Sequence, residues 1–168
     1  EAQHDVQVIL DFVGFGADIA RCDLVDGRVE GIGILDVQPV EGIPQLVCSG
    51  ADHVAAYDLT TGAELWWMPY NGFSVVGRPS YGNDLFYVVG SIRQDHFCIY
   101  AVRPGKGRLR DDQIIWQNSK GIAHVSSPLL VGKEIFVVHD GGVGSCIDAM
   151  TGEPHWRERL GGNHDASP

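Results

Sequence analysis

Positive charge and long apolar runs are both scarce in this chain of 168 residues. Lys and Arg number 12 against 22 Asp and Glu, which gives a formal net charge of −10. Nucleic-acid binding needs patches of Lys and Arg, so this balance argues against a nucleic-acid partner. No run of about 18 apolar residues occurs, so no membrane span is expected. Residues 1–5 lack the basic and apolar stretches of a signal peptide, which says nothing about export if the chain is truncated.

Cysteine is also sparse, and none of it is paired along the sequence. No Cys-x-x-Cys occurs, so zinc and thioredoxin-like sites lack the spacing they require. The four cysteines are Cys22, Cys48, Cys98 and Cys146. The last three fall in predicted strands, where we expect them to act as small buried apolar residues. A disulfide between strands stays open, because sequence alone cannot fix the geometry it needs.

Familiar catalytic motifs are missing as well. There is no Gly-x-Ser-x-Gly elbow and no evident set of Ser, His and Asp. The segment Gly14–Gly16 lacks the third glycine and the following helix of a dinucleotide-binding turn. The segment Asp140–Gly144 offers too few oxygen ligands for calcium and instead predicts a tight hairpin. The seven histidines include no pair at the spacing that puts two metal ligands on one face.

What the chain does contain is a phrase of eleven residues that occurs twice, at 56–66 and at 146–156. Both copies hold an Asp, then Thr-Gly three and four positions later, then a Trp four positions after the Gly. The residues of this skeleton are Asp58, Thr61, Gly62 and Trp66 in the first copy and Asp148, Thr151, Gly152 and Trp156 in the second. A recurring unit of this kind indicates a repeat architecture.

The skeleton predicts a tight turn followed by a strand that carries a large aromatic ring. An Asp side chain can bond to backbone two residues on, and Gly takes a positive φ without steric cost. A Trp at a fixed offset from the turn is suited to wedge between neighbouring sheets, where it buries roughly 150–250 Å². We therefore expect Trp66 and Trp156 both to be buried, and replacement of either by Ala to cost roughly 3–5 kcal/mol.

Two independent landmarks give the length of the repeat. The steps between tryptophans are 116 − 66 = 50 and 156 − 116 = 40 residues. The steps between prolines are 128 − 79 = 49 and 168 − 128 = 40 residues. The unit is therefore about 40 residues long, with about ten extra in the middle copy. The excess falls at 103–112, whose Pro, Gly and charged residues predict an exposed hairpin loop.

Four short strands in a period near 40 residues predict an all-β fold made of β-propeller blades, each a four-stranded antiparallel sheet. The blades are expected at about 31–69, 75–119 and 125–160, with the start of a fourth at 163–168. Residues 1–30 fit the repeat poorly and form either a separate N-terminal segment or the remnant of a preceding blade. A propeller needs about four to eight blades to close, so this one is incomplete. We expect either a fragment of a longer protein, completed by its remaining blades, or closure by self-association.

The phrase Ala-Tyr-Asp-x-x-Thr-Gly-x-x-x-Trp, followed by a strand that begins with Pro, resembles the repeat of pyrroloquinoline-quinone-like β-propellers. The resemblance covers roughly residues 38–168. In that family the recurring Trp docks between adjacent blades, which implies this role for the skeleton residues and for Trp116. Many members are bacterial, and the resemblance favours a periplasmic or extracellular location. Some members are quinoprotein dehydrogenases, whereas others are non-enzymatic, including a scaffold lipoprotein of the outer-membrane barrel-assembly machinery.

The activity must be argued from the site, because a fold does not imply a function. In the dehydrogenases of the family, a Trp and a disulfide between adjacent cysteines sandwich the quinone beside a calcium ion. This chain has no Cys-Cys pair, so pyrroloquinoline quinone and calcium are not expected in this segment. Our leading hypothesis is a non-enzymatic segment that binds a protein or a small ligand. The alternative is part of a quinoprotein-type oxidoreductase whose cofactor site lies outside this segment.

His124 and His164 are the candidates for a site in the central channel of the propeller. Each lies three residues before a Ser-Pro element, and equivalent positions in successive blades face the same part of a propeller. A shared polar or metal site is one interpretation. The other is an ordinary histidine in a loop or at the start of a strand.

Overall fold

The computed structural model describes the greater part of the chain, and its regular structure is almost entirely β-strand, with one short 3-10 helix at Asp111–Gln113. The residues described are 20–21, 32–33, 35–50, 52–71, 77–93, 96–120, 122 and 126–162. Of the N-terminal segment at 1–30, only β1 (Ala20–Arg21) falls in this set, where it pairs with β2 (Ile32–Gly33). The expected start of a fourth blade at 163–168 lies outside the described residues. Within them, no helix has the length and hydropathy to cross a membrane.

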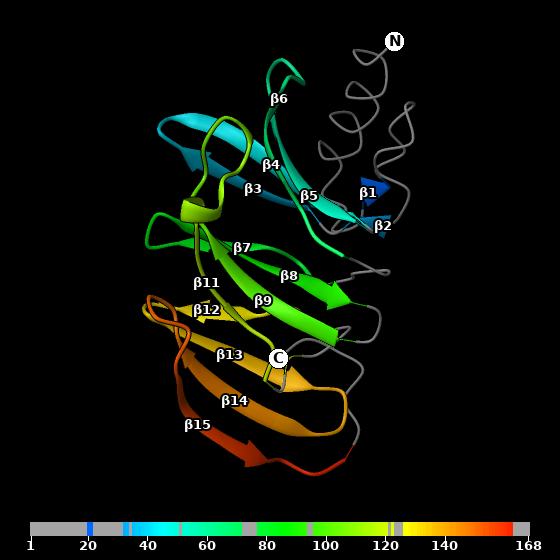
Figure 1. Cartoon of the computed structure of the whole chain (residues 1–168), viewed down its shortest axis with the longest axis vertical. Helices are drawn as coiled ribbons and strands as arrows, with labels where there is room; N and C mark the ends of the chain where they lie inside the picture. Colours follow the sequence, from blue (N-terminus) through cyan, green and yellow to red (C-terminus); the bar gives the residue numbers. More distant parts are fainter. Residues whose placement is uncertain are drawn as a thin grey trace.

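Three antiparallel sheets follow one another along the chain and stack down the length of the molecule (Figure 1). The first holds β3 (Leu35–Val40), β4 (Ile43–Ser49), β5 (His53–Asp58) and β6 (Glu64–Pro69). The second holds β7 (Ser80–Gly82), β8 (Leu85–Arg93), β9 (His96–Val102) and β11 (Ile114–Asn118). The third holds β12 (Leu129–Val131), β13 (Glu134–His139), β14 (Val143–Asp148) and β15 (Pro154–Arg159). The predicted fold of four-stranded β-propeller blades is confirmed.

The core lies between these sheets, and the middle blade carries most of it. From Leu85 to Val89 every side chain is at most 2% exposed, because this blade is covered on both faces. Trp66 from the first sheet and Ile135 from the third belong to the same buried cluster. A fully buried side chain of this size contributes roughly 1.5–3 kcal/mol. The three blades are therefore joined by one continuous apolar interior.

The first strands of the second and third blades are also tied together by hydrogen bonds. The Ser80 hydroxyl donates to the Pro128 carbonyl at 2.9 Å, and the Asn83 side-chain amide donates to the Gly132 carbonyl at 2.9 Å. These bonds add directional contacts to the apolar packing between the two blades.

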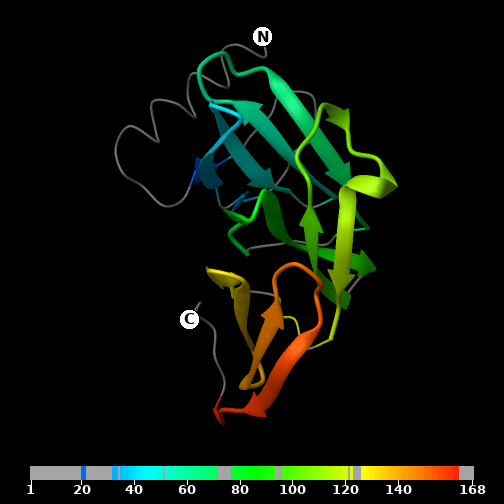
Figure 2. The same cartoon turned by 90° about the vertical axis from the view of Figure 1, so that its left-hand side faces the viewer.

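The extra residues at 103–112 join the antiparallel strands β9 and β11 and are mostly exposed, as expected, but they do more than close a hairpin. They contain β10 (Gly107–Arg108), which crosses to the first sheet and pairs in parallel with β6, the outer strand of the preceding blade (Figure 2). The Leu109 amide then donates to the Trp67 carbonyl at 2.8 Å, and the Leu109 side chain is only 5% exposed. An outer strand presents a row of unpaired backbone groups, and β10 satisfies part of that row.

Trp156 is also placed differently from the expectation. Trp66 is fully buried, but Trp156 is 42% exposed. The third sheet is the last one described, and within the described residues no further blade lies against its outer face. The local pattern is the same at the two positions, and only the presence of a neighbouring sheet differs.

We predict that the two tryptophans contribute very differently to the stability of this chain. Trp66→Ala should lower the free energy of unfolding by about 3–5 kcal/mol, because it empties a packed site. Trp156→Ala should lower it by about 1 kcal/mol or less, as expected for an exposed position. Urea denaturation followed by circular dichroism measures both values. Equal losses would contradict the exposed placement of Trp156.

Candidate functional site

The first copy of the repeated phrase forms a turn in which one carboxylate organises the backbone. Asp58 Oδ1 accepts hydrogen bonds from the amides of Thr60 at 2.7 Å and Thr61 at 3.1 Å. The Gly62 amide donates to the Asp58 carbonyl at 2.8 Å, with Gly62 at φ 72°. The turn closes when the Asp58 amide donates to the carbonyl of Ala63 at 2.9 Å.

The second copy repeats this arrangement bond for bond. Asp148 Oδ1 accepts from the amides of Met150 at 2.8 Å and Thr151 at 2.9 Å. The Gly152 amide donates to the Asp148 carbonyl at 2.8 Å, with Gly152 at φ 76°. Four residues on, the next strand carries Trp156. The Asp, Thr and Gly of the phrase are thus placed by short-range hydrogen bonds that their own side chains and backbone supply.

Trp116 docks on this second turn from the preceding blade. Its indole Nε1–H donates to the carbonyl of Ala149 at 2.9 Å, and the Asn118 side chain donates to the carbonyl of Gly152 at 2.8 Å. The ring lies so close to Gly152 that a side-chain carbon there would come within 2.7 Å of it. Glycine is therefore needed at 152 both for its positive φ and for the room it leaves to the indole.

Trp66 docks in a different way, because the middle blade lacks the Asp-x-x-Thr-Gly turn. At the corresponding place the Arg103 amide bonds to the carbonyl of Gln113 at 2.8 Å, and the inserted residues lie between these two. The Trp66 indole instead donates to Gln45 of its own blade at 2.9 Å. Its ring packs on Phe86 of the next blade, with centroids 5.4 Å apart.

On the third blade an apolar row crosses all four strands on the side that faces away from the second blade. The strand register places Leu129, Phe136, Cys146 and Trp156 opposite one another. Leu129 is 45% exposed, and the Phe136 and Trp156 rings lie 6.3 Å apart. This row is the candidate binding surface of the described residues. It contains the indole of Trp156, and among the described residues no turn packs on that ring as the turn at 148–152 packs on Trp116.

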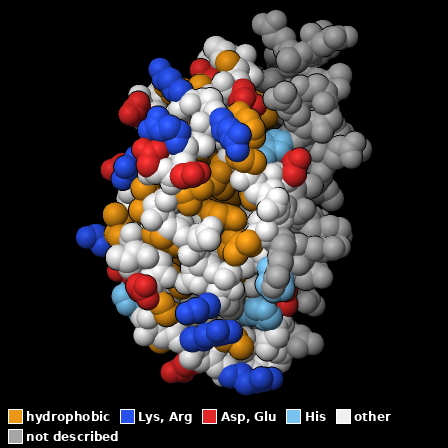
Figure 3. Space-filling model, in the orientation of Figure 1, with side chains coloured by type: hydrophobic (Ala, Val, Ile, Leu, Met, Phe, Trp, Pro, Cys, Tyr) orange, Lys and Arg blue, Asp and Glu red, His pale blue; other side chains and the backbone are white. Residues whose placement is uncertain are grey.

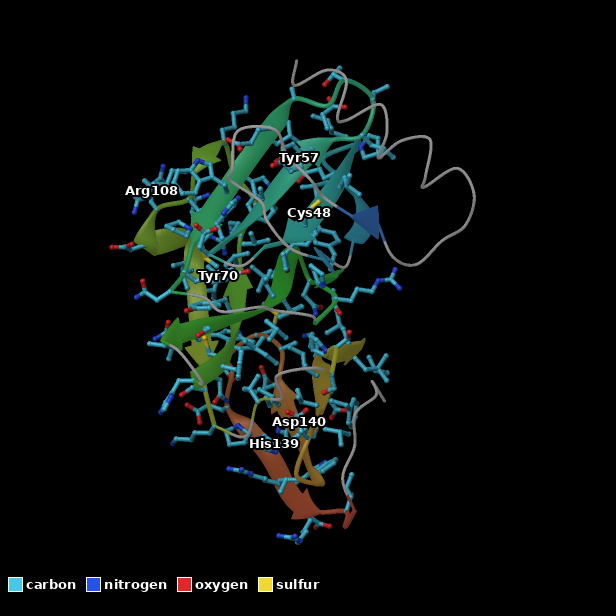
Figure 4. All side chains as sticks on the ribbon, turned by 90° about the vertical axis from the view of Figure 1, so that its right-hand side faces the viewer. Cys48, Tyr57, Tyr70, Arg108, His139 and Asp140 are labelled. Atoms are coloured by element: carbon cyan, nitrogen blue, oxygen red, sulfur yellow. The ribbon has the colours of Figure 1, made fainter. Side chains whose placement is uncertain are left out.

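Two hairpin ends carry histidines that the sequence analysis did not single out. His53 Nδ1 lies 2.6 Å from Asp52 Oδ1, and the His53 ring is edge-on to Trp67. His139 Nδ1 accepts a hydrogen bond from the Gly141 amide at 2.9 Å, beside Asp140 (Figure 4). The sequence feature that could have revealed them is an Asp next to a His at the hairpin between the second and third strands of each repeat. The His139 ring is held within its own hairpin end, whereas the His53 ring also contacts Trp67 on β6.

The structure brings no metal-binding set together within the residues it describes, where no group of three or more His, Cys, Asp and Glu is suitably placed. His124 and His164, the channel candidates, lie outside those residues, as does Cys22. Cys48, Cys98 and Cys146 are buried thiols. Burial raises the pKa of Cys98 to about 11 and also raises that of Cys146, so both are protonated at neutral pH.

Comparison with known proteins agrees with this geometry. The model of a family described as the outer membrane protein assembly factor BamB matches residues 99–168. No curated protein matches the sequence at a significant level. Among solved structures, BamB from Moraxella catarrhalis is similar with 18% identity and a TM-score of 0.57, over 75% of this chain and 38% of that one.

Two enzymes share the fold as well. A europium-containing methanol dehydrogenase has 16% identity and a TM-score of 0.60, over 82% of this chain and 36% of that one. A quinohemoprotein alcohol dehydrogenase from Pseudomonas putida HK5 has 17% identity and a TM-score of 0.54, over 92% of this chain and 23% of that one. The chain thus spans less than two fifths of each of these structures. Residues 99–168 thus match the model of that family, and the three solved structures share the β-propeller fold with this chain.

We predict that Gly152→Ala is more damaging than Gly132→Ala. Both glycines have a positive φ, so an alanine costs roughly 1 kcal/mol of backbone strain at either position. Nothing lies within 4 Å of the new carbon at 132, whereas the Trp116 ring lies 2.7 Å from it at 152. Urea denaturation should therefore give a loss at 152 at least about 1 kcal/mol larger. Equal losses would mean that the indole does not rest on this turn.

The two turn carboxylates should make stability depend on acid pH. Bonds from the Thr60 amide lower the pKa of Asp58, and bonds from the Thr151 amide lower that of Asp148, from the ordinary 3.8. Because the folded pKa is depressed, this stabilisation is present above the ordinary value and is lost as pH falls through the folded one. Carboxyl-carbon NMR titration of the native chain should give midpoints below 3.8. A midpoint at or above 3.8 for either residue would show that these bonds do not favour the charged form.

Proposed function

We propose that this chain is a non-enzymatic propeller segment that serves as a binding scaffold for protein. The proposal is supported by the structural roles of side chains that could otherwise act in catalysis. Asp58 and Asp148 each spend one carboxylate oxygen on two backbone amides of a turn. Cys98 and Cys146 are buried thiols with raised pKa values. Burial keeps the two thiols from a substrate, and each of the two carboxylates has one oxygen committed to its turn.

The apolar row of the third blade is the surface on which the propeller would be continued. Trp156 stands where Trp116 stands one blade earlier, and Trp116 is covered by a turn of the next blade. The occupant of the row is therefore a further blade, supplied by the rest of a longer chain or by a second copy. A closed ring of this kind is a rigid platform for a protein partner. A periplasmic or outer-membrane setting fits the description of the matching family.

The alternative is a quinoprotein-type oxidoreductase whose cofactor site lies outside this segment. The two dehydrogenases share the fold at 16% and 17% identity, which bears on architecture alone. The described residues offer no ligand set that favours this alternative over the scaffold.

Titration with pyrroloquinoline quinone and calcium tests the proposal. The purified chain should give no change in the quinone absorbance spectrum and no complex by native mass spectrometry. Trp156→Ala provides the matched control, because it removes the exposed indole on which a planar quinone would stack nonspecifically. A one-to-one complex with the wild-type chain that persists in this variant would contradict the non-enzymatic proposal.

A further inference from the structure

The molecule contains its own example of a strand added to the outer edge of a blade. β10 pairs in parallel with β6, placing Gly107 opposite Trp66 and Arg108 opposite Trp67. The Arg108 guanidinium lies over the Trp67 ring, 5.6 Å from its centroid. The next residue, Leu109, turns inward and joins the buried cluster that includes Trp66. A guest strand on such an edge therefore alternates one residue for the outer face with one for the core face.

β15 is the corresponding outer strand of the third blade, and its outer edge has no guest among the described residues. All six of its residues are exposed. Trp156 and Arg157 occupy the repeat positions of Trp66 and Trp67. The Trp67 carbonyl accepts the bond from the added strand, so the Arg157 carbonyl is the acceptor that corresponds to it. An edge of this kind can take an extended peptide by strand addition.

The side chains of β15 indicate which peptide chemistry would complement this edge. Successive residues of a strand point to opposite faces, so Arg157 and Arg159 share one face, and Trp156 and Glu158 lie on the other. Neither arginine forms an ion pair within the described part of the chain, although the whole chain carries a charge of −10. In Figure 3, Lys and Arg side chains lie at the upper end of the molecule as well as at the lower end, where the third sheet lies. Trp156 stands beside Phe136, at the end of the apolar row.

We propose that the outer edge of β15 binds an extended peptide in which acidic and apolar residues alternate. The peptide pairs in parallel with β15, as β10 does with β6. Its acidic side chains lie against Arg157 and Arg159, and its apolar ones lie beside Trp156. The proposal rests on the protein-binding function above and names the chemistry of the partner. The edge of β11 in the second blade is a poorer host, because Gln117 stands where β15 has Arg157.

A labelled peptide of sequence Gly-Glu-Leu-Glu-Leu tests this proposal. Fluorescence anisotropy gives its affinity for the whole chain, and amide NMR shifts locate it. We expect shifts along β15, and binding about tenfold weaker to Arg157→Glu, because charge reversal replaces one attraction by one repulsion. The matched control is Gln117→Glu, at the equivalent place on β11, which should bind as the wild type does. A peptide with Lys in place of Glu should bind more weakly than the acidic one.

Several results would overturn the inference. They are an absence of binding to the wild type, equal binding by Arg157→Glu, shifts along β11 instead of β15, and equal binding of a peptide whose leucine nitrogens are methylated. The methylated peptide cannot donate the backbone bonds, so its equal binding would exclude strand addition. Pairing of two chains through β15, seen by sedimentation and abolished by Arg157→Glu, would replace the peptide with a second copy. The outcome of the quinone titration does not depend on any of these results, so the non-enzymatic proposal and the peptide proposal can fail separately.

Discussion

The seating of a tryptophan ring on a glycine turn is the contact on which the junction between the second and third blades depends. The Trp116 ring needs a flat support and its N–H needs an acceptor, and the turn at 148–152 supplies both through Gly152 and the Ala149 carbonyl. Asp148 holds that turn in shape by binding two of its amides. The Asp, Thr, Gly and Trp of the repeated phrase therefore act together. The Asp, Thr and Gly form a turn in one blade, and the Trp of the preceding blade packs on that turn.

The middle blade shows what happens when that turn is missing. The inserted residues stand in its place, so Trp66 turns its N–H to Gln45 in its own blade. The insertion then restores a connection between blades by another route, with β10 paired to β6 and Leu109 in the shared core. One junction of this molecule is thus held by an indole on a turn, and the other by an added strand. The proposed binding surfaces on the third blade correspond to these two kinds of contact, one at the Trp156 ring and the other at the outer edge of β15.

The sequence predicted the parts of this structure that are decided locally. Asp58 and Gly62 shape their turn through bonds within five residues, so the turn and the strand that follows could be read from the phrase itself. The path of β10 could not be read in this way, because two residues carry no strand signal and their partner is forty residues away in the chain. The exposure of Trp156 depends on which sheet covers it, and the local sequence, which resembles that around Trp66, does not contain this information. The Asp-His hairpin ends were readable as a pattern, but their contacts were not.

Hydrogen exchange of the indole N–H groups shows directly whether the Trp116 ring is seated on its turn. We expect the Trp116 N–H to exchange slowly, because it is bonded to the Ala149 carbonyl across the junction between blades, and the Trp156 N–H to exchange fast. Assigned indole signals in a proton NMR spectrum recorded after transfer to deuterated water give both rates. Exchange of Trp116 as fast as that of Trp156 would show that the ring is not seated on the turn, and the explanation of how the blades are joined would be wrong.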